Sequence, residues 1–234
     1  MDNNYDFITY LFISPKKIII SINKKKNFEQ IYKKEKLFEN VSNNLPYDKI
    51  DKFLNENILL IEKDLKSFIK KVNLIIQSKD FLPVQISLKQ NDHDTLISQQ
   101  NLNYLLNEAK NQCKDTTRGK KIIHMLIDGY LIDDRHHTDF PDQTKCHSFS
   151  LDIRFICLQI ILVEKFEQIL KKYQISLSQI VDSNYIESFF NNEDLDIFNK
   201  ANKIINGFNR NEVQIIDKKI RKNGLFERFF DLFS

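Results

Sequence analysis

The sequence predicts an α+β fold, and the segment from Lys121 to Val181 gives the clearest signs of it. Residues 149–159 place an apolar side chain at every second position, which is the period of a half-buried strand. Residues 163–173 place apolar side chains three or four positions apart, which is the stripe of an amphipathic helix. The segment contains no catalytic signature, so function has to be sought in other parts of the chain.

The elements before this segment follow the same two periods. Short apolar strands at 7–13 and 18–22 flank a Ser-Pro-Lys-Lys turn and predict a hairpin, followed by a third strand at 28–38. The strongest helix pattern covers residues 48–70, with Asp48 near its start as the expected cap. The remaining predicted elements are strands 72–77 and 84–89, a helix 98–113 capped by Ser98, a strand 122–132, a polar loop 133–145, a strand 177–181 and a helix 193–205.

Length and charge set the limits on class. A chain of 234 residues can bury a core and can hold one large domain or two small ones. The net charge of +3 is the small difference between 35 basic and 32 acidic side chains, which does not imply nucleic-acid binding. Lysine runs near the N-terminus leave that function open as an alternative, but Glu29, Glu35 and Glu39 interleave with them and favour solvated strand edges.

The cysteines and the apolar runs indicate a soluble protein of a reducing compartment. Cys113, Cys146 and Cys157 are too few and too scattered for a disulfide framework. The N-terminus carries acidic residues where a signal peptide would be basic. The longest nearly apolar run, residues 155–163, is far shorter than the roughly 20 residues that span a bilayer.

Side chains of metal-ligand type gather in one loop, but their spacing matches no compact zinc motif, so we expect no metal. His124 lies on an apolar strand and is interpreted as a hydrogen-bonded core histidine. Nothing in the sequence pairs Cys113 or Cys157 with a base, so no nucleophile is predicted. The loop set comprises Asp133, Asp134, His136, His137, Asp139, Asp142, Cys146 and His147.

The last eleven residues give the best functional signal from composition alone. On a helical wheel their apolar side chains fall within an arc of roughly 160°, behind a basic flank, which is typical of a helix that lies in a membrane interface. The alternative is that these aromatic side chains pack onto the protein's own core. The predicted membrane-binding residues are Leu225, Phe226, Phe229, Phe230, Leu232 and Phe233, with Lys218, Lys219, Arg221 and Lys222 for anionic headgroups.

The order of elements and several loose motifs resemble the bacterial cell-division protein family FtsA, whose members are actin-related membrane adaptors. The best match is KIIHMLIDGYLIDD at residues 121–134, and the resemblance runs from about residue 7 to about residue 190. Further matching segments are the helix at 97–109, Phe140-Pro141, Asp152-Ile-Arg-Phe-Ile, the helix at 163–173 and LSQIVDSNY at 177–185.

The resemblance implies a partial actin-like domain with an inserted subdomain of the FtsA type, the second actin lobe missing, and a C-terminal amphipathic helix. It also implies the division of the chain. The expected parts are an actin-like subdomain at 1–82, the inserted subdomain at 83–176, a return strand and helix at 177–206, a basic linker at 207–223 and a membrane-targeting helix at 224–234.

The chain departs from the family where the family binds nucleotide. Family members cradle phosphate with Gly-rich hairpins, because Gly lets backbone N–H groups approach the anion. Here the first hairpin turn carries no Asp and no Gly, and Pro15 lacks an N–H. The second hairpin, expected after Tyr185, is absent. We therefore expect a protein without ATPase activity or cofactor, and interpret Lys16 and Lys17 as a solvated turn.

The function implied by the resemblance is a cell-division adaptor at the cytoplasmic face of the bacterial membrane. Its expected partners are anionic lipids and other division proteins, with FtsZ or a second copy of the chain as candidates, and no nucleic acid. The family's grip on FtsZ uses the missing lobe and cannot be transferred residue by residue. The alternative is an actin-like ATP-binding protein that acts with a partner, in the manner of FtsA or of the pilus-assembly scaffold.

Overall fold

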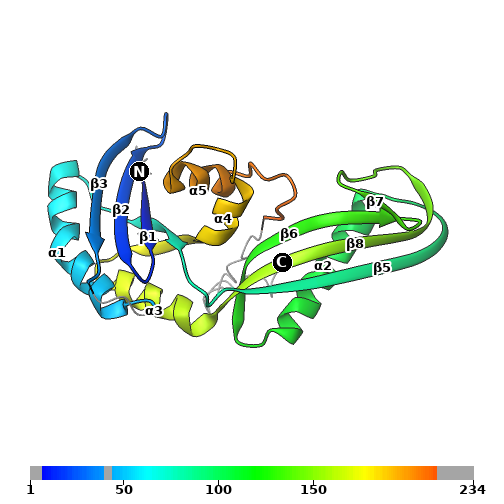
Figure 1. The fold of residues 1–234 in the computed structure, drawn as a ribbon, viewed down its shortest axis with the longest axis horizontal. Coiled ribbons are helices and arrows are strands. Elements are labelled where there is room, and N and C mark those ends of the chain that lie inside the picture. Colours follow the sequence, from blue (N-terminus) through cyan, green and yellow to red (C-terminus); the bar gives the residue numbers. More distant parts are fainter. Residues whose placement is uncertain (1–6, 40–43, 215–234) are drawn as a thin grey trace, which may run out of the picture.

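The computed structural model describes residues 7–39 and 44–214, and for residues 91–95 it describes the backbone only. This part of the chain forms two β-sheets and five helices (Figure 1). The prediction of an α+β fold is confirmed.

The first sheet has five strands in the order β3-β2-β1-β4-β9. Its first three strands in sequence are antiparallel neighbours, whereas β4 and β9 run parallel to β1. Parallel neighbours need a crossover connection, and α1 and α3 occupy these connections. The strands are β1 (Phe7–Ile13), β2 (Lys17–Lys24), β3 (Gln30–Leu37), β4 (Lys71–Ile76) and β9 (Ser176–Asp182).

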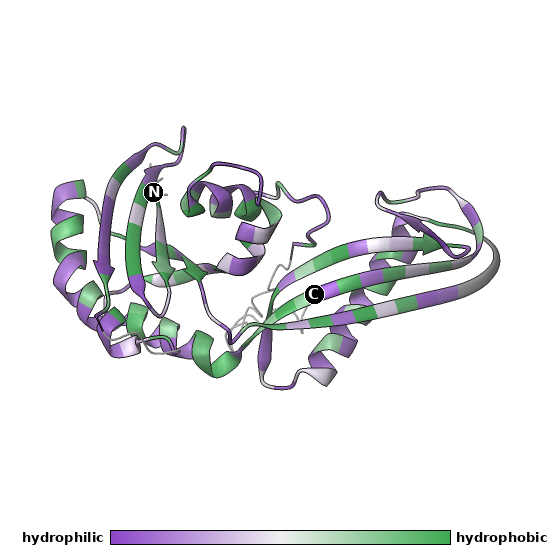
Figure 2. Cartoon of the chain, in the orientation of Figure 1, coloured by the Kyte–Doolittle hydropathy of each residue, from purple (hydrophilic) through white to green (hydrophobic). Residues whose placement is uncertain are grey.

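The central strands of this sheet are apolar on both faces because helices cover both faces (Figure 2). Along β1, Leu11 and Ile13 join the core beneath α1 and α3, while Tyr10 and Phe12 join the core beneath α4 and α5. The period of two along a strand sorts the side chains between the two cores. The helices are α1 (Tyr47–Leu65), α3 (Ile160–Lys171), α4 (Ser183–Phe189) and α5 (Ile197–Ile205).

The second sheet is antiparallel, and in the described part of the chain α2 (Gln99–Thr116) covers one of its faces. Its strands alternate accordingly, as Figure 2 shows. Polar pairs occupy the other face: Arg154 lies 2.9 Å from Asp128, and Ser87 Oγ donates to Asp152. The strand order is β5 (Leu82–Leu96), β8 (Lys145–Gln159), β6 (Lys120–Ile132) and β7 (Arg135–His137).

The two sheets share core residues where they meet. Leu126 and Ile156 of the second sheet pack in the α4–α5 core of the first. Helix α3 packs wholly in the first core, through Phe166 and its neighbours, although the sequence-based division assigns it to the inserted subdomain at 83–176. That division of the chain stays a prediction.

The helix predicted at 48–70 begins at Tyr47 and ends at Leu65. Lys66 takes the left-handed conformation (φ 51°), and its N–H bonds back to Glu62 and Lys63. Phe68, which the pattern places on the buried stripe, is 69% exposed. Asp48 lies in the first turn and is not the cap, because Pro46 occupies that position.

Three local features differ from the sequence-based expectation. The predicted loop at 133–145 contains β7, which packs against β6 because Gly129 has no Cβ to overlap the His136 ring. The short helix α4 was not predicted. The last predicted helix begins at Ile197, four residues late, because Asp196 caps it by accepting from the N–H groups of Phe198 and Asn199.

We expect Phe166→Ala to lower the free energy of unfolding by about 3–5 kcal/mol, because the ring is buried between α3 and the first sheet and its loss leaves a cavity. Urea unfolding measures the change. Leu59→Ala is the control, since Leu59 is 76% exposed on α1 and should change stability by about 0.5 kcal/mol or less. Equal effects of the two variants would contradict the packing of α3.

Candidate functional site

The β1–β2 turn is where a phosphate cradle would be expected, and its backbone amides already have a partner. The hydroxyl of Ser14 accepts hydrogen bonds from the N–H groups of Lys16 (3.2 Å) and Lys17 (3.0 Å). A phosphate cradle needs such N–H groups to point at the anion. Here the hydroxyl of Ser14 accepts from these N–H groups in place of an anion. Serine side chains commonly bond to nearby backbone groups in this way. The Lys17 side chain in turn lies 3.1 Å from Glu35.

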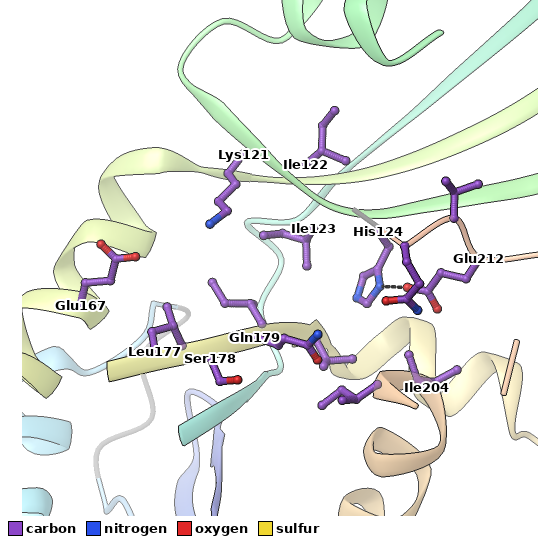
Figure 3. Close-up of a pocket in the computed structure, with 15 residues that line it drawn as sticks. Lys121, Ile122, Ile123, His124, Glu167, Leu177, Ser178, Gln179, Ile204 and Glu212 are labelled. Carbon is purple, nitrogen blue, oxygen red and sulfur yellow. Dashed lines mark hydrogen bonds and ion pairs between the residues drawn. The ribbon is translucent and has the colours of Figure 1, made fainter. Parts of the chain in front are cut away.

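A buried polar network lies where the two sheets meet, and Figure 3 shows its centre. His124 of β6 is 3% exposed, and its Nδ1 lies 2.6 Å from the carboxylate of Glu212. The other ring nitrogen, Nε2, accepts a hydrogen bond from the backbone N–H of Asp182. Because Nε2 accepts, it carries no proton, and Nδ1 is the nitrogen that donates to Glu212. His124 is thus the hydrogen-bonded core histidine that the sequence predicts.

Glu212 also contacts α4, one of the helices that cover the first sheet. Its second carboxylate oxygen accepts from the hydroxyl of Tyr185 on α4, which accepts in turn from the side chain of Asn209. Burial raises the pKa of Tyr185 well above its usual range, so the hydroxyl stays a donor. A strand of the second sheet and a helix that covers the first sheet therefore hold one carboxylate.

Residues 209–214 lie along β6, although the sequence predicts a polar linker from residue 207. The N–H of Ile127 donates to Asn211 and the N–H of Val213 donates to Met125, in an antiparallel arrangement. No local sequence signal marks Glu212, because its partner His124 is 88 positions away in the chain. The first part of the expected linker is in fact part of the fold.

A cavity of about 150 Å³ lies beside this network. Its walls come from the start of β6, from the free edge of β9, from α5 and from the segment that ends at Gln214. Lys121 and Glu167 stand at one side and His124 and Glu212 at the other (Figure 3). The cavity is small, and the His–Glu pair in it is engaged in holding the chain together.

Asp182 connects the network to α4. Its carboxylate caps the helix by accepting from the N–H of Asn184, and its own N–H donates to His124. The residue is 5% exposed, and this burial raises the pKa of its carboxyl group. Desolvation therefore disfavours the ionised form of the Asp182 carboxyl group.

The other ligand-type residues do not gather into a site. Among the described residues, no group of three or more His, Cys, Asp or Glu side chains could hold a metal ion. Cys113 and Cys157 face each other with sulfur atoms 3.8 Å apart, and burial raises the pKa of Cys157 to about 12. Both thiols therefore stay protonated at neutral pH and are poor nucleophiles.

The predicted membrane-binding residues, 218–233, lie outside the described residues. In the part of the chain that is described, no helix is both long enough and apolar enough to cross a bilayer.

We expect Glu212→Ala to lower the free energy of unfolding by about 2–3 kcal/mol, because it leaves His124 and Tyr185 without their buried charged partner. It should also expose residues 209–214 to limited proteolysis. Arg210→Ala, at an exposed position of the same segment, is the control. Unchanged stability and cleavage would mean that the carboxylate does not hold this segment.

We expect Asp182→Asn to stabilise the protein at neutral pH. Asn keeps an oxygen for the N–H of Asn184 but carries no charge to desolvate. Since burial raises the pKa of Asp182, the wild-type protein loses stability as pH rises through that pKa, and the variant does not. The difference should vanish below the ordinary Asp pKa of about 3.9. Urea unfolding of both proteins across pH tests this, and a variant that is less stable at every pH would refute it.

Comparisons with known proteins give structural similarity only. No protein-family model and no curated protein sequence matches the chain. The cytoplasmic domain of EpsL, an inner-membrane component of the type II secretion system of Vibrio cholerae, has 10% identity and a TM-score of 0.40, over 77% of this chain and 58% of that one.

Two further solved structures are similar to the same degree. A PilM–PilN type IV pilus biogenesis complex has 7% identity and a TM-score of 0.43, over 78% of this chain and 49% of that one. A Bacteroides thetaiotaomicron protein with an actin-like ATPase fold and unknown function has 13% identity and a TM-score of 0.36, over 81% of this chain and 58% of that one. This chain thus matches between 49% and 58% of the length of the three. At these scores the similarities carry no conclusion about its activity or partners.

Proposed function

We propose that this chain is a non-enzymatic adaptor of the actin-like class that binds the cytoplasmic face of the bacterial membrane and joins cell-division components there. The observation that carries the non-enzymatic part is the β1–β2 turn. The N–H groups of Lys16 and Lys17 donate to Ser14, and Pro15 has no N–H to offer. A phosphate at this turn would have to displace the Ser14 hydroxyl from both amides.

The membrane part of the proposal is supported by the sequence of the tail. A short aromatic helix gains from burying its apolar face in the interface, and each basic residue of the flank adds about 1 kcal/mol near anionic lipid. Ordering a free tail offsets part of this gain. One copy therefore binds weakly, and several copies in an assembly bind far better through their effective concentration.

The cell-division context is supported by the resemblance of residues 121–134 and of the element order to the FtsA family. Partners in this proposal are anionic lipids and other division proteins. The second candidate function is an actin-like ATP-binding protein completed by a partner chain, in division or in pilus assembly. The exposed side chain of Lys16 on the β1–β2 turn favours that candidate, because a cation stands where the class holds phosphate.

We expect the full chain to co-sediment with anionic vesicles and Phe229→Asp/Phe230→Asp to abolish this binding, because two charges on the apolar face oppose its insertion. Vesicle co-sedimentation at fixed salt measures it. A chain that ends at Lys222 should behave like the double variant, and Phe208→Asp, an exposed aromatic position of the described fold, is the matched control.

Binding that persists without the tail would contradict the membrane tether. Measurable ATP affinity that is lost on Lys16→Ala/Lys17→Ala would instead favour the ATP-binding candidate. The vesicle and nucleotide measurements are independent, so each part of the proposal can fail separately.

A further inference from the structure

Five basic side chains surround one end of the second sheet, where it meets the first. They come from three elements: the end of α2, the turn that follows it and the start of β6. Helix α3 begins beside them, since the N–H of Ile160 donates to the carbonyl of Gly119 in that turn (2.9 Å). We call this surface the basic face; it consists of Lys110, Lys114, Arg118, Lys120 and Lys121.

The basic face is a shallow hollow of about 380 Å³, lined by its four lysines together with Glu164 and Glu167 of α3. Four basic side chains and two acidic ones thus line the hollow. Within the described residues, Lys110, Lys114, Arg118 and Lys120 form no ion pair. Their charges are therefore available to an anionic partner.

Exposed apolar side chains lie at the same end of the sheet. The pairing of Lys120 with Gln159, and of Leu82 with Cys157, brings the starts of β6, β5 and α3 together. Ile160 is 40% exposed, Ile161 56% and Leu82 39%. In Figure 2 the start of α3 is a continuous apolar turn. Basic charge around exposed aliphatic side chains is the composition of a surface that enters a lipid interface.

The described chain ends pointing toward this face. Residues 211–213 run antiparallel to β6, so each step toward the C-terminus moves toward the start of β6 at Lys120. Gln214 and Lys121 line the same cavity. Residues 215–223, which separate Gln214 from the aromatic tail, span at most about 30 Å. The tail can therefore reach a bilayer that touches the basic face.

We propose that the basic face binds the headgroups of anionic phospholipids and forms a second membrane contact beside the tail. This inference rests on the proposed membrane function and names an additional surface for it. Once the tail has inserted, the basic face meets lipid as part of the same molecule, so its weak attraction acts at high effective concentration. The two contacts together fix which side of the fold faces the bilayer.

The phosphates of a nucleic acid carry the same negative charge as lipid headgroups, but a nucleic-acid backbone has no apolar surface to cover Ile160 and Ile161. The exposed isoleucines favour lipid, and nucleic-acid binding becomes an outcome of the test. Three neutral substitutions, Lys110→Gln, Lys114→Gln and Arg118→Gln, remove charge from exposed or half-buried positions. The first two lie in α2, where Gln keeps the helix propensity of Lys, and Arg118 lies in the turn after α2. The control removes three charges elsewhere, at Lys25, Lys26 and Lys34, on the β2–β3 turn and the edge strand of the first sheet.

The experiment measures partition of the full chain onto vesicles of increasing phosphatidylglycerol content, for the wild type, the face variant, the control variant and Phe229→Asp/Phe230→Asp. Loss of three charges from the face should weaken partition about a hundredfold on anionic vesicles. The control variant should partition like the wild type. Thermal unfolding checks that every variant is folded.

The outcomes separate the inference from the function on which it rests. If the tail variant loses binding and the face variant binds like the wild type, the second contact is overturned and the tether remains. Equal weakening of the face and control variants also overturns it, because the effect is then net charge alone. Undiminished binding in every variant, including the tail variant, contradicts the tether by the tail and overturns the second contact, whereas absence of wild-type binding overturns the proposed membrane function. Salt-dependent DNA binding that the face substitutions abolish, without a change on vesicles, assigns the face to nucleic acid.

Discussion

The buried contact between His124 and Glu212 fixes the path of the last described residues. It joins β6 to a segment 88 positions later, and Tyr185 holds the same carboxylate from α4. A carboxylate buried with two donors is stable only while both are present, since leaving a charged group unpaired in the interior is costly. The junction of the two sheets and the path of the last described residues thus depend on one another.

The first sheet makes this arrangement possible because both of its faces are apolar. A strand such as β1 sends alternate side chains to opposite cores, so helices must cover both sides. Helices α4 and α5 provide the second cover and carry Tyr185 to the junction. The second sheet needs only α2, because its other face is polar and bears pairs such as Arg154 with Asp128.

Sequence periodicity predicts those elements whose environment is set by burial. The β1–β2 hairpin, α2 with its Ser98 cap and the long β8 strand follow the predicted pattern closely. Periodicity does not predict a helix end that is set by the backbone conformation of one residue. Lys66 takes a left-handed conformation and ends α1 five residues earlier than the apolar pattern predicts. Periodicity also fails where a contact joins distant positions. The alternation around His124 predicts a buried histidine. No pattern near Glu212 indicates that it contacts His124, so the sequence predicts a linker at residues 209–214.

If the tail binds a membrane as proposed, the position of the last described residues bears on how the protein is oriented there. A single short helix in the interface does not by itself fix which side of the attached domain faces the bilayer. Direction requires a second contact at a fixed place on the fold. The antiparallel run of residues 211–213 along β6 leads to Gln214, which lines one cavity with Lys121 at the end of the sheet where the basic face and the exposed isoleucines lie. If both contacts engage one bilayer as proposed, the membrane lies against α2 and α3. Of the described part of the fold, the polar face of the second sheet and its edge strand β5 then point away from this contact.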